Sequence, residues 1–441
     1  MSKEDLQQLL YSAKLLVENG LSSAAEFRAR LVAADTISVA MAAGRRPEAM
    51  ELVADHPLLG RVRYEAPGAL YRSSLLTANG GWASAESAAY INGSILCALE
   101  MDEGTRPTGH PAAHIIPAVL AAAEAWELTV GDVLEALLYG YEVSASLLEA
   151  HTLAPGIHPH GHLGGIGAAA AVAHLADADP LPAAEVAATS MLATHWGSCL
   201  DGASARNTWT GQSAAAAVRA YQLATSGWTG GTSVLDSVFD GLLAQETQIA
   251  VPDPQRPRIF NGYFKFYSAC ALTHTSIEAA LGITGFDAED VQSVSVRTTR
   301  NNLKVANGSL ETPLSRRFSI PFAVATALVE GVASPAAFDE PNELALSMAR
   351  RIHVEEDPTL SDQWPDAAPA VVEVLFTDGS TRSARCDNAK GVTTDGSIEQ
   401  ELRAKTIGLH EFGDALWSAV MEAPGQLPIE QLMKSVQAMA R

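Results

Sequence analysis

The sequence lacks the features that mark membrane and exported proteins. No apolar run approaches the about 20 residues that a transmembrane helix needs, and the charged first twenty residues contain no small-residue cleavage pattern. Cysteine is scarce, and its four copies form no CxxC pair for zinc or a redox dithiol: Cys97, Cys199, Cys270 and Cys386. We therefore expect a soluble, cytoplasmic protein without disulfides.

Positive charge is also scarce. The chain has 29 Lys and Arg against 51 Asp and Glu, which gives a formal net charge of −22. Such a charge repels phosphate backbones, and no basic cluster offsets it, so the composition argues against a nucleic-acid partner. A small anionic substrate would need cations gathered at its site, so each cation near a histidine motif is informative.

Aromatic residues make up only 6% of the 441 residues, whereas 47% are hydrophobic, so the core must be mainly aliphatic. From residue 1 to about 247, alanine- and leucine-rich stretches place apolar residues three and four positions apart, which predicts helices. The clearest of these helices are expected at residues 23–43, 117–125, 130–149 and 167–175.

The pattern changes after a proline-rich joint at residues 251–257. β-Branched residues predict a strand at 291–298, and residues 371–386 predict a hairpin around Asp378-Gly379, a dipeptide typical of a type I′ turn. Helices are expected at 320–330 and 343–351, and again from about 397 to a last helix at 429–441. We predict a mostly α protein with an all-helical domain (1–262 and 395–441) and an inserted α+β lid domain (263–394). Three successive units are the alternative.

A first motif, Glu100-Met-Asp102-Glu-Gly-Thr-Arg-Pro-Thr-Gly-His110-Pro, precedes a predicted helix. Two acids and a histidine before a helix N-terminus suit acid–base chemistry and anion binding, because free N–H groups there attract carboxylates. A capping loop with surface carboxylates is the alternative, since acids, Gly and Pro are ordinary loop residues.

A second motif contains three alternate histidines: His158, His160 and His162. Such spacing suits a metal site, but no HExxH or second His/Cys pair supports one. The favoured alternative is that two of the three histidines are structural or solvated. The glycines that follow are not a dinucleotide fingerprint, because a helix and not a strand precedes them.

A third motif joins Lys265, Cys270 and His274. Lys265 lies beside aromatic residues and can hold a carboxylate. A nucleophilic Cys270 assisted by His274 is the less favoured interpretation, because a reactive thiolate needs an electropositive pocket.

A fourth motif is the polar loop around Arg206, which leads into an alanine-rich helix. The planar fork of an arginine side chain matches a carboxylate. A surface arginine is the alternative.

Together these segments resemble, in the same order, the MmgE/PrpD family, which includes 2-methylcitrate dehydratase, cis-aconitate decarboxylase and iminodisuccinate epimerase. The first motif resembles the family's aspartate-rich loop ending in His-Pro, and the second its next histidine motif. The Lys265 segment resembles its lysine motif, and Arg317-Phe-Ser-Ile-Pro-Phe322 its lid segment.

The resemblance implies a helical domain with an inserted α+β lid, a homodimer, and a cofactor-independent site between the domains. That site would use His110, His158, Lys265 and the loop around Asp102. Relatives acting on cis-aconitate usually carry Thr, Lys and Tyr where this chain has Gly104, Ala215 and Phe322. Where many members have Lys-Pro-Leu-His, this chain has Arg206-Asn-Thr-Trp209, so a citrate-like substrate is not implied.

The chemistry common to such enzymes is removal of a proton beside a carboxylate, which needs a base and cations that stabilise the enolate-like product. Histidine, with a reference pKa of ~6.5, suits the base. We assign His110 and His158 as base and acid in unspecified order, Lys265 and Arg206 as carboxylate clamps, and Asp102 as the residue that orients a histidine. The expected substrate-binding residues are Arg206, His162, Cys270, His274 and Glu100.

The favoured function is a cofactor-independent, dehydratase-like lyase for a small di- or tricarboxylic acid. An epimerase or a decarboxylase is the alternative, because the same intermediate can be reprotonated or formed by loss of carbon dioxide. Two other classes are a non-enzymatic binding protein on this scaffold, against which the two histidines argue, and a histidine-dependent metalloenzyme.

Overall fold

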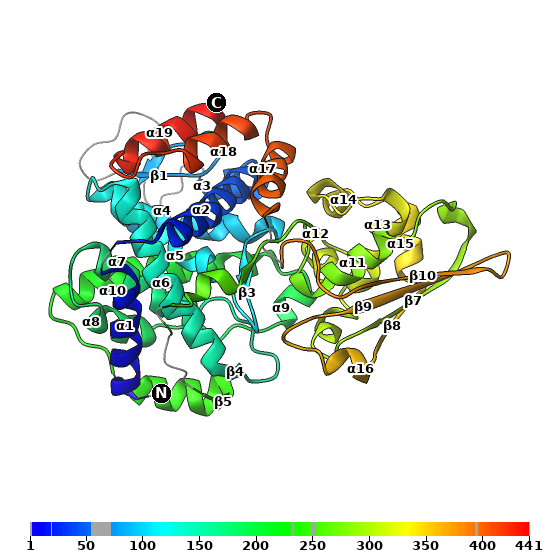
Figure 1. Cartoon of the computed structure of the whole chain (residues 1–441), viewed down its shortest axis with the longest axis horizontal. Helices are drawn as coiled ribbons and strands as arrows, with labels where there is room; N and C mark the ends of the chain where they lie inside the picture. Colours follow the sequence, from blue (N-terminus) through cyan, green and yellow to red (C-terminus); the bar gives the residue numbers. More distant parts are fainter. Residues whose placement is uncertain are drawn as a thin grey trace.

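The computed structural model describes residues 2–18, 20–53, 72–231, 233–248, 253, 255–392 and 396–440. The chain is mostly α-helical, as predicted, with a large helical body and a smaller part built on a four-stranded sheet (Figure 1). Within the described ranges, no helix combines the length and apolar character needed to cross a bilayer. The predicted proline-rich joint at 251–257 lies partly outside the described residues.

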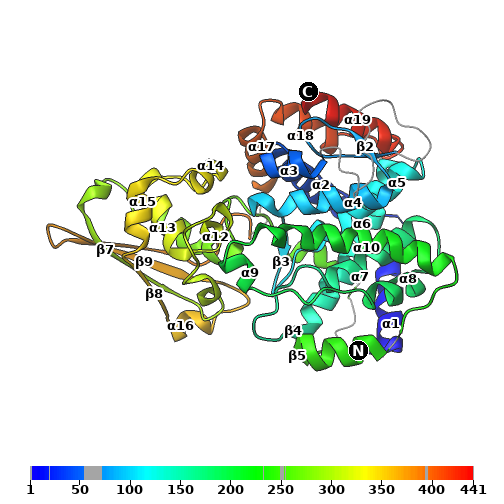
Figure 2. The ribbon, with the colours of Figure 1, turned by 180° about the vertical axis from the view of Figure 1, so that it is seen from behind.

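The helical body packs around one aliphatic core. Its central helices are α2 (Ser23–Ala43), α4 (Ala85–Leu96), α5 (Pro111–Ala125), α6 (Val130–Ala150), α7 (Leu163–Leu175) and α10 (Thr208–Thr225). Small residues let these helices approach closely, because a Cβ added at Gly140 of α6 would meet the side chain of Ala171 on α7 at 2.7 Å. Figure 2 shows α10 crossing the back of the body beside α4 and α7.

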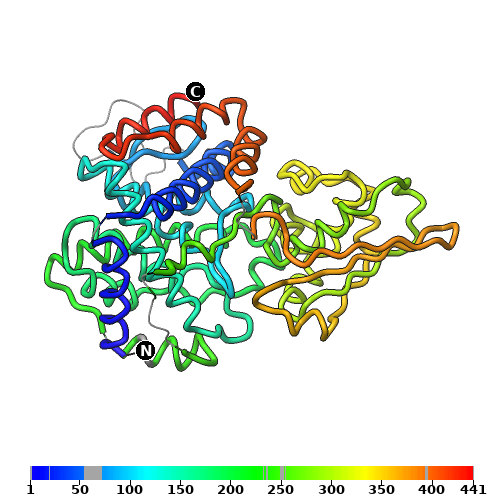
Figure 3. The backbone as a smooth tube through the Cα atoms, in the orientation of Figure 1, coloured from blue at the N-terminus to red at the C-terminus, as the bar shows by residue number. Residues whose placement is uncertain are grey.

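The end of the chain returns to this body. Helices α17 (Ile398–Leu409) and α18 (Gly413–Met421) pack on α2, and α19 (Ile429–Ala440) packs beside strand β1 (Ser73–Ser74). Figure 3 shows these red and orange C-terminal segments lying over the blue α2. The two ends of the sequence therefore share one hydrophobic core.

The four-stranded sheet has the order β10-β9-β7-β8. Its strands are β7 (Val291–Thr298), β8 (Ile352–Glu356), β9 (Ala370–Phe376) and β10 (Thr381–Cys386). β7 is antiparallel to β9 and parallel to the short edge strand β8. The strand at 291–298 and the hairpin are confirmed, whereas β8 was not predicted, because five residues carrying two glutamates give a weak strand signal.

The predicted type I′ turn is wrong. Only Gly379 of the Asp378-Gly379 pair has a positive φ, at 83°, whereas a type I′ turn needs positive φ at both central residues. The N–H of Gly379 donates to the carbonyl of Phe376 at 3.0 Å, and the N–H of Phe376 donates to the carbonyl of Ser380 at 2.9 Å. This pattern is that of a turn followed by a glycine bulge.

Helices α11 (His274–Leu281), α13 (Ile320–Glu330) and α15 (Glu343–Ala349) pack together and with the sheet around a second hydrophobic core. α13 has the predicted bounds, and α15 ends two residues before the predicted position. The domain boundaries predicted near residues 262 and 395 stay a prediction.

Candidate active site

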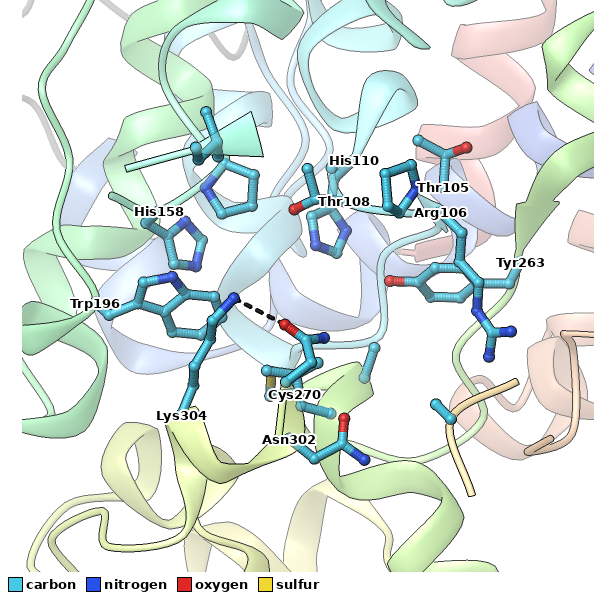
Figure 4. Close-up of a pocket in the computed structure, with 18 of the residues that line it drawn as sticks. Thr105, Arg106, Thr108, His110, His158, Trp196, Tyr263, Cys270, Asn302 and Lys304 are labelled. Carbon is cyan, nitrogen blue, oxygen red and sulfur yellow. Dashed lines mark hydrogen bonds between the residues drawn. The ribbon is translucent and has the colours of Figure 1, made fainter. Parts of the chain in front are cut away.

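A cavity of about 490 Å³ opens between the helical body and the sheet part. All the predicted site residues line it except Asp102 and His162: Glu100, His110, His158, Arg206, Lys265, Cys270 and His274. Figure 4 shows His110 and His158 on one side of the cavity, with Cys270, Asn302 and Lys304 facing them from the other.

A short strand pair brings two distant motifs together. β3 (Gly104–Thr105) pairs with β6 (Gly262–Tyr263) in antiparallel register, so the acidic loop lies beside the chain that leads to Lys265. Glu100, just after the short helix η1 (Cys97–Leu99), has a left-handed φ of 53°. This turn lets both Glu100 and Asp102 direct their carboxylates at Lys265.

Four buried charged groups form a chain of ion pairs beside the cavity. The Lys265 ammonium lies 3.0 Å from Asp102 and 3.5 Å from Glu100, and the Arg206 guanidinium lies 2.6 Å from Glu100. Burial alone would raise the pKa of Asp102, but the charges of Lys265 and His110 and their hydrogen bonds lower it overall. Burial likewise opposes the charge of Lys265, yet Asp102 and Glu100 raise its pKa above the ordinary value. Asp102, Lys265 and Arg206 are therefore charged at neutral pH.

His110 stands immediately before α5 with its ring fixed by two acceptors. Its Nδ1 lies 2.9 Å from the Asp102 carboxylate and 2.6 Å from the carbonyl of Glu103. Because a carbonyl and a carboxylate oxygen have no hydrogen to donate, Nδ1 carries the hydrogen of the neutral ring and Nε2 keeps a lone pair. His110 thus has the tautomer that a general base at Nε2 requires.

Glu103 binds the N-terminal end of α5. Its carboxyl accepts a hydrogen bond from the N–H of Ala112 at 2.6 Å and another from the hydroxyl of Tyr141 at 3.1 Å. Burial raises the pKa of Glu103 to about 8. This residue holds the segment that carries His110.

His158 presents the opposite tautomer. Its Nδ1 accepts a hydrogen bond from the N–H of His160 at 3.2 Å, so the hydrogen of the neutral ring lies on Nε2. The rings of Trp196 and Trp209 lie 4.5 and 5.2 Å away, centroid to centroid. Burial first, and then the charge of Arg206, lower the pKa of His158 well below its usual value. The ring is therefore a neutral hydrogen-bond donor.

The ring of His160 packs against the rings of both His110 and His158. Its ring centroid is 4.5 Å from that of His110 and 4.7 Å from that of His158. It is fully buried, and within the described residues neither ring nitrogen has a hydrogen-bond partner. Burial lowers the pKa of His160 well below its usual value, so this ring is neutral as well.

Cys97, Asp102 and His160 could hold a metal ion, since one ligand atom of each lies within 4.8 Å of the others. Among the described residues, the less favoured set of His158, His160 and His162 is not brought together as a group of possible ligands. Burial raises the pKa of the Cys97 thiol, which contacts Thr210 at 3.4 Å, and Asp102 is already paired with Lys265. A metal ion would have to displace a thiol proton and an ion pair, so the site fits a metal poorly.

His162 is directed away from the main cavity. Its Nε2 donates to the carbonyl of His158 at 2.6 Å, and it lines a second cavity of about 490 Å³ together with Ala215. Burial lowers the pKa of His162 to about 4. The structure thus gives His162 a contact that holds the His158 backbone.

Cys270 and His274 line the cavity without forming an activated pair. Burial raises the pKa of the Cys270 thiol to about 12 and lowers that of His274 to about 3. Nε2 of His274 donates to the carbonyl of Ala269 at 2.9 Å. The Cys270 thiol is neutral, and the His274 imidazole already donates a hydrogen bond to the backbone, so this pair does not favour nucleophilic catalysis.

Three of the departures from the family lie in different surroundings. At Gly104, an added Cβ would collide with the hydroxyl of Tyr263, so this tyrosine fills the space of a larger residue. Ala215 lines the second cavity, and Phe322 is fully buried in the second core with its ring 5.5 Å from that of Phe338. The alanine and phenylalanine therefore do not alter the wall of the main cavity.

Sequence reasoning missed several lining residues. Trp196, Tyr263, Asn301 and Lys304 all reach this cavity. Trp196 and Asn301 stand in loops, Tyr263 in the two-residue strand β6 and Lys304 in the single turn η7 (Asn302–Val305), and no periodicity or motif signals a site in such short segments.

Two sequence profiles match the chain. The MmgE/PrpD N-terminal domain matches residues 13–248, and the MmgE/PrpD C-terminal domain matches residues 267–413. No curated protein matches the sequence. With matches over most of its length, the chain belongs to the MmgE/PrpD family, whose members are generally enzymes of the dehydratase type.

Proposed function

We propose that this protein is a cofactor-independent lyase that removes a proton beside a carboxylate of a small di- or tricarboxylic acid and then expels a leaving group such as hydroxide. The observation that carries the proposal is the contact of His110 Nδ1 with Asp102 and with the Glu103 carbonyl. It leaves the basic Nε2 of His110 available to a substrate.

In the proposed step, His110 takes the proton through Nε2 and becomes a cation beside Asp102. The carboxylate at 2.9 Å stabilises that imidazolium and keeps the ring oriented. Charge then develops on the substrate carboxylate, which becomes enolate-like. The hydrogen on Nε2 of His158 and the ammonium of Lys265 both line the same cavity and are the groups that stabilise this charge.

His158 acts in this scheme mainly as a neutral donor. A strongly lowered pKa makes a protonated His158 scarce at neutral pH, so its contribution is a hydrogen bond to the developing oxyanion. After His110 is protonated, it can return that proton to the departing hydroxyl group as water forms. Abstraction and elimination then use the same residue in turn.

An epimerase is the second candidate. Two histidines of opposite tautomer line one cavity, each with its ring within 4.7 Å of the His160 ring. That arrangement suits removal of a proton on one side of a carbon and its return on the other.

The test uses purified protein in deuterium oxide with a panel of hydroxy-, unsaturated and amino-di- and tricarboxylates, followed by mass spectrometry. We expect deuterium in the product or in recovered substrate. Replacing His110 or His158 by alanine should lower kcat by ~100- to 10,000-fold. His353→Ala, on the exposed side of β8, is the matched control and should stay within a few-fold of the parent.

If His110→Ala and His158→Ala both stay folded by circular dichroism and turn over within a few-fold of the parent, the catalytic assignment is wrong. The homodimer also stays a prediction, which the mass from light scattering at micromolar concentration checks.

A further inference from the structure

The two buried cations that line the cavity, Lys265 and Arg206, are already paired with carboxylates. Lys265 and Arg206 carry two positive charges, and Glu100 and Asp102, which pair with them, carry two negative charges. This network stabilises charge that develops during the reaction, but its net charge is zero. A doubly charged substrate therefore needs another cation to hold its second carboxylate.

Lys304 differs from these buried cations. It stands on η7, on the sheet side of the cavity, and its ammonium donates to the side-chain oxygen of Asn301 at 2.8 Å. Among the described residues it has no carboxylate partner. Its charge is therefore available to an anion in the cavity.

The ammonium of Lys304 is directed toward the histidine side. It lies 5.8 Å from the ring centroid of Trp196, whose ring in turn lies 4.5 Å from that of His158. Figure 4 shows Lys304 extending from the sheet side toward Trp196. A small ligand that reaches His158 thus extends toward Lys304.

Two other cations of the cavity wall are engaged elsewhere. The guanidinium of Arg106 donates to the carbonyls of Pro365 and Asp366, at 3.1 and 2.8 Å. Lys390 lies 3.8 Å from the carboxylate of Glu401. Both contacts reduce what these residues can offer to a substrate.

We propose that Lys304, with the side-chain amide nitrogen of Asn301 beside it, anchors the carboxylate of the substrate that is remote from the reacting carbon. The substrate class is then a small dicarboxylate, with one carboxylate toward His158 and Lys265 and the other toward Lys304. This inference rests on the proposed function.

The test compares succinate with butyrate, which has the same carbon count but one carboxylate, by titration calorimetry at pH 7.5. The wild type should bind succinate about ten- to a hundredfold more tightly than butyrate, because a charged hydrogen bond is gained. Lys304→Met keeps the volume and removes the charge, so that ratio should fall to near one. Lys304→Arg should keep most of the preference for succinate.

Lys434→Met removes an exposed lysine paired with Glu430 on α19 and should leave the ratio unchanged. A wild-type protein without preference for succinate, or a folded Lys304→Met variant that keeps the full preference, would overturn the anchor. Because binding needs no turnover, the two proposals fail separately. If the preference for succinate depends on Lys304 but no deuterium exchange occurs, only the proposed chemistry is wrong. If deuterium exchange occurs but Lys304→Met keeps the preference for succinate, only the proposed anchor is wrong.

Discussion

The guanidinium of Arg206 lies 2.6 Å from the carboxylate of Glu100, and both side chains are almost completely buried. An ion pair of this kind is costly to form but more costly to break, since removing one partner leaves the other charge without compensation.

We expect Arg206→Met to lower the free energy of unfolding by about 3–5 kcal/mol at pH 7, measured in urea, because the buried Glu100 loses its closer cation and keeps only Lys265, at 3.5 Å. The double variant Glu100→Gln/Arg206→Met should lose less than the sum of the single changes. Arg219→Met removes the exposed partner of Glu86 and should cost at most about 1 kcal/mol. A loss below about 1 kcal/mol in Arg206→Met would show that the buried pair is not formed.

Asp102→Asn tests the orientation of His110. An amide keeps the shape of the side chain but removes the charge beside Nδ1, so we expect kcat to fall about 100-fold or more with a smaller change in KM. The measurement is steady-state turnover of the substrate that the panel identifies. Asp414→Asn, which removes an exposed partner of Arg403, should leave kcat within a few-fold. Equal turnover in both variants contradicts the proposed role of Asp102.

Glu124 predicts a pH dependence of stability. Burial raises its pKa to about 8 in the folded chain, where it accepts hydrogen bonds from Ser74 at 2.6 and 2.8 Å. The unfolded value is ~4.3, so the folded state holds a proton that the unfolded state has lost. The free energy of unfolding should therefore fall as pH rises from about 4.3 to 8, by up to about 1.4 kcal/mol per pH unit.

Buried histidines act in the opposite sense at lower pH. The pKa of His114 falls to about 4 on burial, so its contribution is lost as pH falls from about 6.5 toward 4. Between pH 6.5 and 8 the histidine contribution is small, but Glu103, whose pKa is also raised to about 8, contributes in the same range. Comparing the wild type with a Glu124 variant cancels the contribution of Glu103 and leaves that of Glu124. Glu124→Gln keeps both contacts with Ser74 and should show a shallower decline in urea unfolding over that range. Parallel curves for the two proteins would contradict the raised pKa.

The sequence predicted helix bounds best where an apolar repeat extended over many residues or where glycine or proline marked the end of a helix. α2 and α13 have their predicted bounds because each is a long apolar repeat begun by a serine cap. α5 begins at Pro111 and not at 117, because a second proline, Pro117, lies inside the helix and resembles a start signal. Proline fits the first turn equally well at either position.

For the site, sequence motifs identified the charged and imidazole groups but not how they pair. No sequence spacing shows that Asp102 contacts both His110 and Lys265, since β3 and β6 bring together segments more than 150 residues apart. Lys304 could not be recognised, because a lone lysine in a short polar loop resembles any surface lysine.

We expect activity to survive prolonged treatment with EDTA. At Cys97 and Asp102 a metal ion would compete with a thiol proton and with Lys265, so tight metal binding is disfavoured. The measurement is turnover before and after chelation, with metal content from elemental analysis. Activity lost to EDTA and restored by zinc or iron would favour the metalloenzyme alternative.

The cavity takes its walls from two separate hydrophobic cores. His110 and His158 belong to the helical body, whereas Asn301 and Lys304 belong to the sheet part. Mutations that change the residues on one side of the cavity need not disturb the packing that supports the other side. Evolution can therefore exchange the acid that is recognised while conserving the proton-transfer apparatus, which gives this architecture a way to diversify.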